Sequence, residues 1–351
     1  MSLAIIEVIL VLAYLFRHSM PSLFVILIFS IIVLGFANIQ LKANHLSKSY
    51  KTYDDEKFYI TGRVKGIDYN YRGMPRLMLS EVEDFDGNKI GDKVRVSLMS
   101  KKGVPSIGSC VEMVALFRPP LQPVMVGGYQ FNRKYFFEGL NAVGSSASRA
   151  LETECKSGYG IKDRMVIYVA DMRQRIVARI AKILPEDQAS ITSALVAGEK
   201  GLINNNLYNN YRDSGLAHFL SISGLHMSMI AGLMFFMVRL VVAAIPPIAL
   251  RYDGKKISAV FAIIMSFVYL LISGAEIPAQ RAFIMTTIVL IGVLVSRRAI
   301  SIKTISWAAL IILIISPQAL IGASFQMSFA AVVCLIAFYE RYASSLSKFL
   351  N

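Results

Sequence analysis

The order of apolar and polar positions divides the chain into three zones. Residues 1–41 hold two apolar runs, at 3–16 and 22–39. The second run is long enough to cross a membrane, whereas the first is marginal, because a span needs about 17–25 residues. Residues 42–162 are polar, and residues 163–351 return to helical and then strongly apolar sequence. The pattern predicts an N-terminal transmembrane hairpin, a polar β domain and an α-helical polytopic membrane domain.

Short alternating segments recur through the polar zone at the spacing of β-hairpins. They cover residues 58–68, 76–82, 93–99 and 110–118 and are separated by turns that contain glycine. A period of two between such turns predicts strands. Four or five short strands in so little sequence predict a small closed barrel, and an OB-like five-stranded barrel fits best.

Barrels of this kind commonly bind single-stranded nucleic acid, although a barrel that serves only as a scaffold is an equally good interpretation. Basic and aromatic residues near the first hairpin could bind phosphates and stack on bases, but aromatic residues on strands more often pack. These DNA-binding candidates are Arg63, Lys65, Tyr69, Tyr71 and Arg72.

Residues 164–184 have apolar positions at the 3.6-residue period and basic residues mostly off that stripe. This pattern predicts an amphipathic helix, which could lie at a membrane interface or dock against the barrel. Long apolar runs then predict about five membrane spans, at residues 225–249, 257–273, 280–296, 304–316 and 325–340.

The short loops between these spans predict the orientation of the chain. Lysine and arginine occur in alternate loops, around residues 251–256, 297–303 and 341–348, and are missing from residues 274–279 and 317–322. By the positive-inside rule the basic loops are cytoplasmic. We therefore expect a multi-pass protein of the inner or plasma membrane, with residues 42–162 on the non-cytoplasmic side.

Composition agrees with a membrane protein. The chain is 55% hydrophobic and 17% charged, whereas soluble domains average about 25% charged residues. The formal net charge of +14 fits basic cytoplasmic loops, attraction to anionic lipid or an anionic cargo such as nucleic acid, and composition alone does not choose among them.

The three cysteines fit the predicted orientation. Cys110 and Cys155 fall in the exported zone, whereas Cys334 lies within a predicted span. Disulfides form and persist outside the cytoplasm, so we expect a Cys110–Cys155 bridge, with two free buried thiols as the alternative.

The stretch HFLSISGLHMSMI, residues 218–230, places polar side chains at the start of a span. Ser223 and His226 are close enough to touch on a helix, which makes an intramembrane serine hydrolase an alternative, although a base and nucleophile on one helix aim poorly at each other. His218 and His226 are eight residues apart with no carboxylate between them, so we expect neither a metal nor another cofactor. A helix break that lines a passage is the interpretation we favour.

Two other polar breaks lie beside predicted spans. Residues 273–282, SGAEIPAQRA, carry Pro278 and Arg281, and residues 316–328, SPQALIGASFQMS, carry Gln326. Loop capping and interfacial anchoring would explain both equally well. Three polar breaks near the non-cytoplasmic side nevertheless favour a shared pathway.

Four segments of the chain closely resemble the ComEC/Rec2 family of competence proteins. They read LVAGEKGLINNNLYNNYRDSGLAHFLSISGLHMSMIAGLMFF (195–236), GAEIPAQRAFIM (274–285), SFQMSFAAV (324–332) and GGYQFNRKYFFEGLNAVG (127–144). The resemblance implies a channel that passes one strand of transforming DNA across the inner membrane during natural competence, behind an exported OB-like domain. It makes the chain a transport protein without catalytic residues.

The resemblance also selects signature residues, which we expect to shape and line the passage. They are His218, Ser221, Ser223, Gly224 and His226 from the long segment, and Pro278, Arg281 and Gln326 from the shorter ones.

The chain departs from the family in one respect. Many members continue through further spans into a metallo-β-lactamase-like domain, whereas this sequence ends at Asn351 without the H-x-H-x-D-H ligands. The expected partners are single-stranded DNA, membrane lipid, other competence proteins and a separate chain that supplies the remaining spans and the nuclease domain. The alternative is an inactive, truncated remnant.

Overall fold

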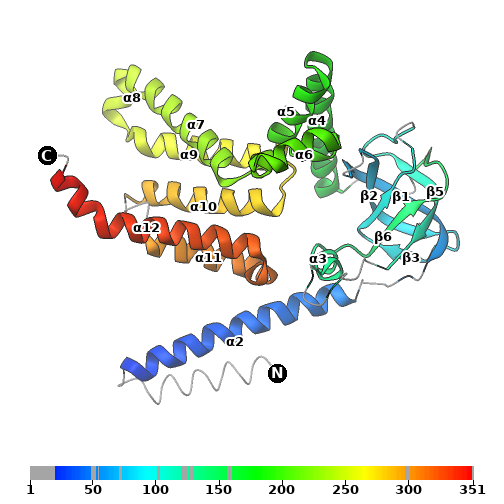
Figure 1. Cartoon of the computed structure of the whole chain (residues 1–351), viewed down its shortest axis with the longest axis horizontal. Helices are drawn as coiled ribbons and strands as arrows, with labels where there is room; N and C mark the ends of the chain where they lie inside the picture. The colour runs from blue at the N-terminus through cyan, green and yellow to red at the C-terminus, as the bar shows by residue number, and fades with distance from the viewer. Residues whose placement is uncertain are drawn as a thin grey trace. The chain divides into compact units, whose positions relative to one another are not determined.

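The computed structural model describes residues 20–48, 53, 55–70, 73–100, 103–119, 125, 128, 130–155, 158, 160–296 and 301–349. The chain forms two compact units, one of Ser49–Thr304 and one that joins Met1–Lys48 to Ile305–Asn351. Helices and strands carry the labels of Figure 1.

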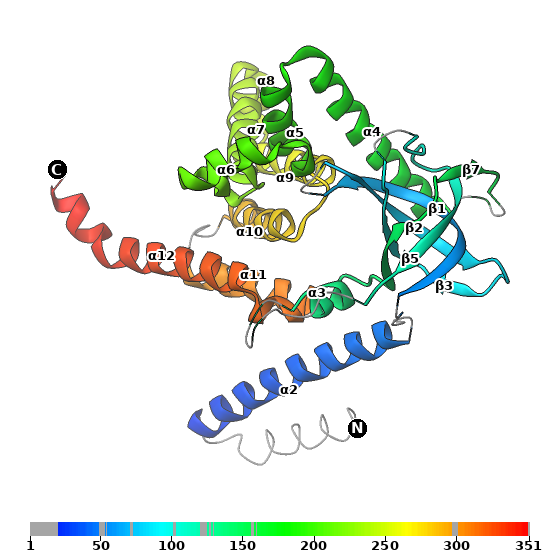
Figure 2. The same ribbon diagram turned by 45° about the vertical axis from the view of Figure 1, so that its right-hand side comes forward.

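The polar zone folds into a closed barrel (Figure 2). Its five strands follow the order β1-β2-β4-β6-β5, and β5 pairs back with β1. Strands β4 and β6 run parallel, and the other neighbours are antiparallel. The predicted small OB-like barrel is therefore confirmed. Its elements are β1 (Glu56–Tyr69), β2 (Pro75–Asp84), β3 (Lys89–Gly91), β4 (Val94–Ser97), β5 (Cys110–Phe117), α3 (Phe131–Phe137), β6 (Ala142–Ser146) and β7 (Leu151–Thr153).

The barrel has a hydrophobic core of its own. Along β5, every second residue from Val111 to Phe117 is buried, because successive side chains of a strand point to opposite faces. The inward positions are mostly β-branched and aliphatic, the types that pack well on a pleated surface. They include Ile60, Val64, Leu77, Leu79, Val82, Val94, Val96, Val111, Met113 and Phe117.

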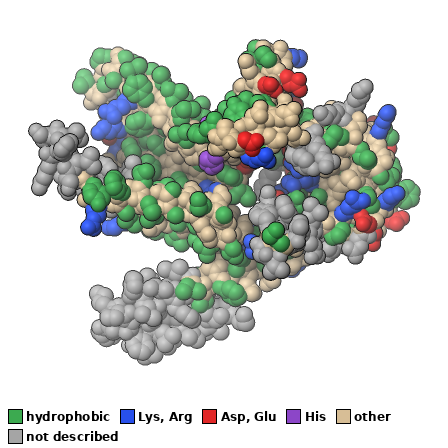
Figure 3. Space-filling model, viewed as in Figure 1, with side chains coloured by type: hydrophobic (Ala, Val, Ile, Leu, Met, Phe, Trp, Pro, Cys, Tyr) green, Lys and Arg blue, Asp and Glu red, His purple; other side chains and the backbone are tan. Residues whose placement is uncertain are grey.

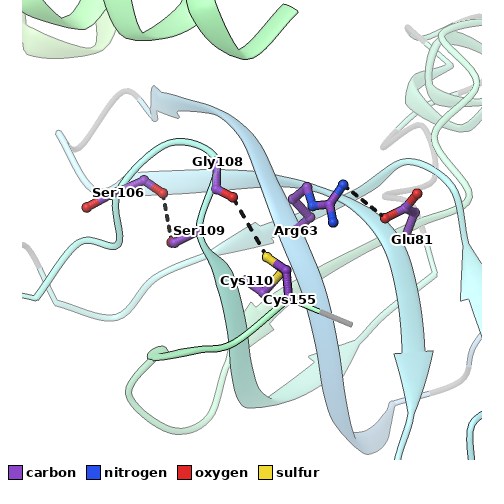
Figure 4. The surroundings of a disulfide bond; sticks show 7 residues. All are labelled: Arg63, Glu81, Ser106, Gly108, Ser109, Cys110 and Cys155. Carbon is purple, nitrogen blue, oxygen red and sulfur yellow. Dashed lines mark hydrogen bonds and ion pairs between the residues drawn. A yellow bond between two sulfur atoms is a disulfide. The ribbon is translucent and has the colours of Figure 1, made fainter. Parts of the chain in front are cut away.

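A disulfide joins Cys110 at the start of β5 to Cys155 just beyond β7 (Figure 4). The two Cα atoms are 5.3 Å apart and the cysteines are separated by 45 positions. Because β7 pairs only through Leu151–Thr153 with β5, the bond holds the end of the barrel segment against its edge.

A helical region follows the barrel within the same unit. It comprises α4 (Ile161–Ile183), α5 (Glu186–Ala197), η1 (Lys200–Leu202), α6 (Asn205–Asp213), η2 (Leu216–Leu220), α7 (Gly224–Ala244), α8 (Pro246–Arg251), α9 (Gly254–Ile272) and α10 (Ile277–Leu294). Among the described residues, α7, α9 and α10 are long and apolar enough to cross a membrane. The first of these spans is shorter than predicted, because Pro246 and Pro247 follow it and proline cannot continue a helix.

The amphipathic helix α4 contacts the barrel, which is one of the two placements predicted for it. The ammonium group of Lys65 on β1 lies 2.7 Å from the carboxylate of Asp163. Further along α4, the amide of Gln174 donates to the carbonyl of Ile67, at 3.2 Å. Helix α4 therefore connects the barrel to the helices that follow.

The helices α7, α9 and α10 pack through small residues. Ser258, Ala259, Ala262 and Ser266 recur every three or four positions along α9 and are fully buried. The hydroxyls of Ser258 and Ser266 donate to carbonyls one turn back, at 2.7 and 2.8 Å, so neither hydroxyl is left unpaired at the contact. Small residues let membrane helices approach closely. Large apolar side chains crowd the outer surface of these helices instead (Figure 3).

The other unit contains α2 (Met20–Ser47), α11 (Ile302–Ile315, from Ile305 on), η3 (Pro317–Ile321) and α12 (Ala323–Phe349). Near the end of α2, Asn38 donates to the carbonyl of Ile314 at 3.0 Å, and Lys42 to that of Ile315 at 3.0 Å. These bonds satisfy carbonyls left free at the end of α11. Apolar helices continue over Ile302–Ile315 and Ala323–Phe338, where two spans are predicted. The predicted first helix, residues 3–16, lies outside the described residues.

Candidate functional site

The signature segment, residues 218–226, is a helix break at the start of a span. Helix η2 ends at Leu220, and Ser221 has extended backbone angles (φ −102°, ψ 137°). Ser223 is also extended (φ −116°, ψ 173°) and is the N-cap of α7, which begins at Gly224. The chain therefore does not run through this stretch as a continuous helix.

Ser223 and His226 form a capping box at the start of α7. The Ser223 hydroxyl accepts the backbone N–H of His226, while Nδ1 of His226 accepts the backbone N–H of Ser223 at 3.2 Å. The hydroxyl oxygen also lies 3.1 Å from Nδ1. A box of this kind satisfies donors that the first turn of a helix leaves free. The spacing that suggested a nucleophile and its base is thus also the spacing of a cap.

Lys200 connects the signature segment to the loop between α9 and α10. Its ammonium group donates to the hydroxyl of Ser221 at 3.0 Å and to the carboxylate of Glu276 at 2.8 Å. Glu276 is the N-cap residue of α10. One side chain therefore joins three segments that are far apart in the sequence.

The turn that carries Lys200 is held closely by its neighbours. Gly198 ends α5 in the left-handed conformation (φ 69°), and a Cβ atom there would collide with the carbonyl oxygen of Ser273. Only glycine adopts this conformation without cost. On the adjoining side, Nε of Arg173 donates to the carbonyl of Ala197 at 2.6 Å, and Gly274 lies against its guanidinium.

Glu199, the residue before Lys200, is buried, with 2% of its surface exposed. Its carboxylate lies 3.3 Å from the guanidinium of Arg173 and accepts the backbone N–H groups of Tyr69 and Gly201. Burial raises the pKa of Glu199 to about 7, Arg173 opposes that rise, and nearby Asp68 adds to it. The end of β1 is thereby attached to the loop that precedes the signature segment.

We call this set of contacts the polar junction. It comprises residues 198–201, Ser221, residues 273–276, Arg173 and the end of β1 at Asp68 and Tyr69. All of these residues belong to one compact unit.

The other signature residues are placed as follows. Pro278 lies in the first turn of α10, and Arg281, on the next turn, is 9% exposed. His218 lies in η2 and is exposed. Gln326 belongs to the other unit, where its amide donates to the carbonyl of Leu320 at 3.0 Å. The structure thus brings Ser221 together with the α9–α10 loop and places Ser223 and His226 directly after it.

The DNA-binding candidates on the barrel do not form an open surface among the described residues. Arg63 is 2% exposed and lies 3.5 Å from Glu81 (Figure 4). It alternates with its core-facing neighbour Val64 and pairs with Ser80 and Cys110, so its side chain is on the outer face of the barrel but is covered there. Lys65 is paired with Asp163 of α4, and Tyr69 lies against Gly201. Tyr71 and Arg72 lie outside the described residues.

The sequence reasoning missed the partners that build the junction, namely Arg173, Glu199, Lys200 and Glu276. The Gly-Glu-Lys turn was visible as part of the long segment, but its two charged side chains were given no role. Their partners come from segments 26 and 76 positions away, a pairing that a single sequence does not reveal. Among the described residues, no three His, Cys, Asp or Glu side chains group together as metal ligands would.

Comparisons with known proteins point to one family. A family profile described as Competence protein matches residues 195–351. Recombination protein 2 of Haemophilus influenzae is 24% identical over 97% of this chain and 41% of its own length. ComE operon protein 3 of Bacillus subtilis is 24% identical over 69% of this chain and 29% of its own length. Competence protein ComA of Neisseria gonorrhoeae is 26% identical over 66% of this chain and 32% of its own length.

The chain therefore spans about three to four tenths of the length of these relatives. No solved structure matches it. The matched region includes the Gly-Glu-Lys turn, the signature segment and the α9–α10 loop, which are the segments that meet in the polar junction. The chain is therefore similar to the ComEC/Rec2 family of competence proteins.

Proposed function

We propose that the chain is a membrane component of the apparatus that takes up DNA in natural competence, and that it helps to form the channel for a single strand. The description of the matching family profile, Competence protein, and the name of one relative, Competence protein ComA, support this role. So do three helices able to cross a membrane. The proposed partners are single-stranded DNA, membrane lipid and other competence proteins.

One observation carries the proposal. Three segments with the family's motifs meet in the polar junction directly before the first span of the bundle, where Lys200 bonds to both Ser221 and Glu276. Polar groups at such depth are costly unless they are paired or line a water-filled cavity. We infer that the junction shapes the mouth of the passage, and that Ser221, Ser223, Gly224, His226, Pro278, Arg281, His218 and Gln326 shape or line its course.

We place the barrel on the non-cytoplasmic side of the inner membrane, where the single strand of DNA would arrive. The alternation of basic loops supports this orientation, and a Cys110–Cys155 disulfide suits an oxidising compartment. Of the five DNA-binding candidates, Tyr71 and Arg72 are kept as proposals on the basis of the sequence alone. Arg63 is buried near Glu81, Lys65 is paired with Asp163 of α4, and Tyr69 lies against Gly201.

Uptake of fluorescent DNA by the competent host tests the proposal. Lys200→Gln removes the charge that joins the three segments, so we expect uptake into the cytoplasm to fall about tenfold or more. Lys182→Gln, at an exposed position on α4, is the matched control and should leave uptake unchanged. Normal uptake in a strain that lacks the whole chain would contradict the proposed function.

The alternative function is an intramembrane serine hydrolase, and one observation favours it: Ser223 Oγ lies 3.1 Å from Nδ1 of His226. That nitrogen already accepts the backbone N–H of Ser223. In the described part of the chain, His226 has no carboxylate partner of the kind that orients a catalytic base. Labelling of the purified chain by a fluorophosphonate probe, and its loss in Ser223→Ala, would establish the hydrolase instead.

A further inference from the structure

Glu199 and Lys200 are adjacent in the chain but bind on different sides of the polar junction. The carboxylate of Glu199 binds Arg173 of α4 and the backbone N–H of Tyr69 at the end of β1. The ammonium group of Lys200 binds Ser221 and Glu276. Two neighbouring side chains therefore connect the barrel to the signature segment.

The backbone that carries this dipeptide has little freedom to move alone. Gly198, on one side, lies against the carbonyl of Ser273, and Gly201, on the other, lies against Tyr69. A Cβ atom at either glycine would overlap that neighbour. Because tightly packed groups transmit displacement instead of absorbing it, the turn and its neighbours must shift together.

We propose that Glu199 and Lys200 form a mechanical link through which the position of the barrel on α4 sets the position of the signature segment. Both are positioning residues, because Glu199 acts through Tyr69 and Arg173, and Lys200 through Ser221. The link is a property of the chain itself. Only its consequence for DNA, the opening or closing of the passage as the barrel moves, rests on the proposed function.

The charges around Glu199 make this link sensitive to pH. The groups that face it are Arg173 from α4, and Asp68 and Tyr69 from β1; Asp68 is itself paired with Arg76 of β2 at 2.9 Å. Burial raises the pKa of Glu199 to about 7, because desolvation of the carboxylate outweighs its attraction to Arg173.

The direction of the pH effect follows from linkage. If opening of the link exposes Glu199 to water, the pKa of its carboxyl returns toward the ordinary value of 4.5. The closed form then holds its proton more tightly, so it is favoured at low pH and loses stability as the pH rises from about 4.5 to about 7. The change slows above pH 7 and is nearly complete by about pH 8. Between pH 5.5 and 8 the opening equilibrium should rise roughly 25-fold.

Hydrogen exchange of the full chain in lipid nanodiscs, without DNA, tests the link. Two regions report on it: the end of β1 around Tyr69 and the signature segment. Glu199→Ala should speed exchange about tenfold or more in both regions. At the end of β1 the bond from Tyr69 to the carboxylate is lost directly, and at the signature segment the effect is passed on through the neighbouring Lys200 and its bond to Ser221. Lys200→Gln should likewise speed hydrogen exchange in the signature segment. Glu186→Gln, at an exposed position on α5, is the matched control for a lost carboxylate.

The pH profile separates a link from a merely structural contact. After correction for the intrinsic pH dependence of exchange, opening in the unmodified chain should rise up to about pH 7 and then level off. Glu199→Gln, which keeps the size of the side chain but does not titrate, should abolish this rise. Faster exchange at β1 in Glu199→Ala with an unchanged signature segment would overturn the link, and a flat profile in the unmodified chain would overturn its pH dependence. Neither outcome depends on DNA uptake, so the proposed function is tested separately.

Discussion

The barrel buries its largest apolar side chains, whereas the bundle of α7, α9 and α10 exposes them. Phe117 of the barrel is 0% exposed, while Phe236 of α7 is 59% exposed. The buried contacts of α9 are made instead by Ser258, Ala259 and Ala262. The two regions are parts of one compact unit, so the difference reflects the solvent that each was built for.

This difference has a physical cause. In water, removal of apolar area is the main force that holds a domain together, so the bulkiest residues go inside. Lipid is as apolar as leucine, so membrane helices gain little by hiding large side chains and are held by close packing of small ones. The polar junction is held in neither of these two ways, but by ion pairs and hydrogen bonds.

The largest effect should come from a cavity in the barrel. Phe117→Ala should lower the free energy of unfolding of the barrel by about 3–5 kcal/mol, because it removes a fully buried ring. Phe236→Ala removes the same side chain from an exposed position of the bundle and should change stability by about 0.5 kcal/mol or less. Denaturant unfolding monitored by limited proteolysis of each region measures both. Equal losses would mean that the two regions do not differ in kind.

The next effect should come from the disulfide. Replacement of Cys110 and Cys155 by serine should destabilise the barrel by about 2–4 kcal/mol, because the unfolded segment is no longer constrained. The control is Cys334→Ser in α12, an exposed free cysteine for which we expect no measurable change. Non-reducing mass spectrometry that finds both thiols of the first pair free would contradict this prediction.

The third effect should come from a larger side chain at a helix contact of the bundle, which should lower its stability more than the loss of an exposed side chain does. Ala259→Leu places a large side chain at a fully buried contact of α9 and should cost about 1–3 kcal/mol. Val260→Leu is the matched control, because Val260 is the next residue along the helix and is exposed. Thermal unfolding in detergent measures both variants, and a tolerated leucine at position 259 would show that the helices pack loosely.

The smallest effect should come from the helix cap in the signature segment. Ser223→Ala removes the hydroxyl that accepts the backbone N–H of His226 and should cost about 1 kcal/mol. Ser228→Ala, one turn further along α7, removes a hydroxyl that bonds only within the helix, to the carbonyl of Leu225, and should cost less. Hydrogen exchange at the start of α7 compares them. Equal exchange in the two variants would assign Ser223 a role other than capping.

Much of the fold was open to prediction because it depends on local pattern. The period-two segments and their glycine turns predict the barrel strands, and long apolar runs predict α7, α9 and α10 within a few residues. The break at residues 221–223 was also predictable, since serine and glycine interrupt an otherwise apolar run. The early end of α7 could have been predicted from Pro246 and Pro247.

The candidate site was predicted only in part. The sequence shows that Ser221, Pro278 and Arg281 lie in unusual polar stretches, but it does not show which of those stretches touch. Arg63 illustrates the limit, because a basic residue on a strand is expected at the surface, and only the tertiary structure shows that this one is 2% exposed and lies near Glu81.

The sequence by itself determined the elements of this protein: a barrel for water, spans for lipid, and a polar break where the chain enters the first span. These follow from the period and length of apolar runs, which are local properties. Only the tertiary structure decided which charges meet. Lys200 finds Glu276 across 76 positions and Glu199 finds Arg173 across 26, because pairing of this kind depends on how packed elements align in space, and no local pattern records it.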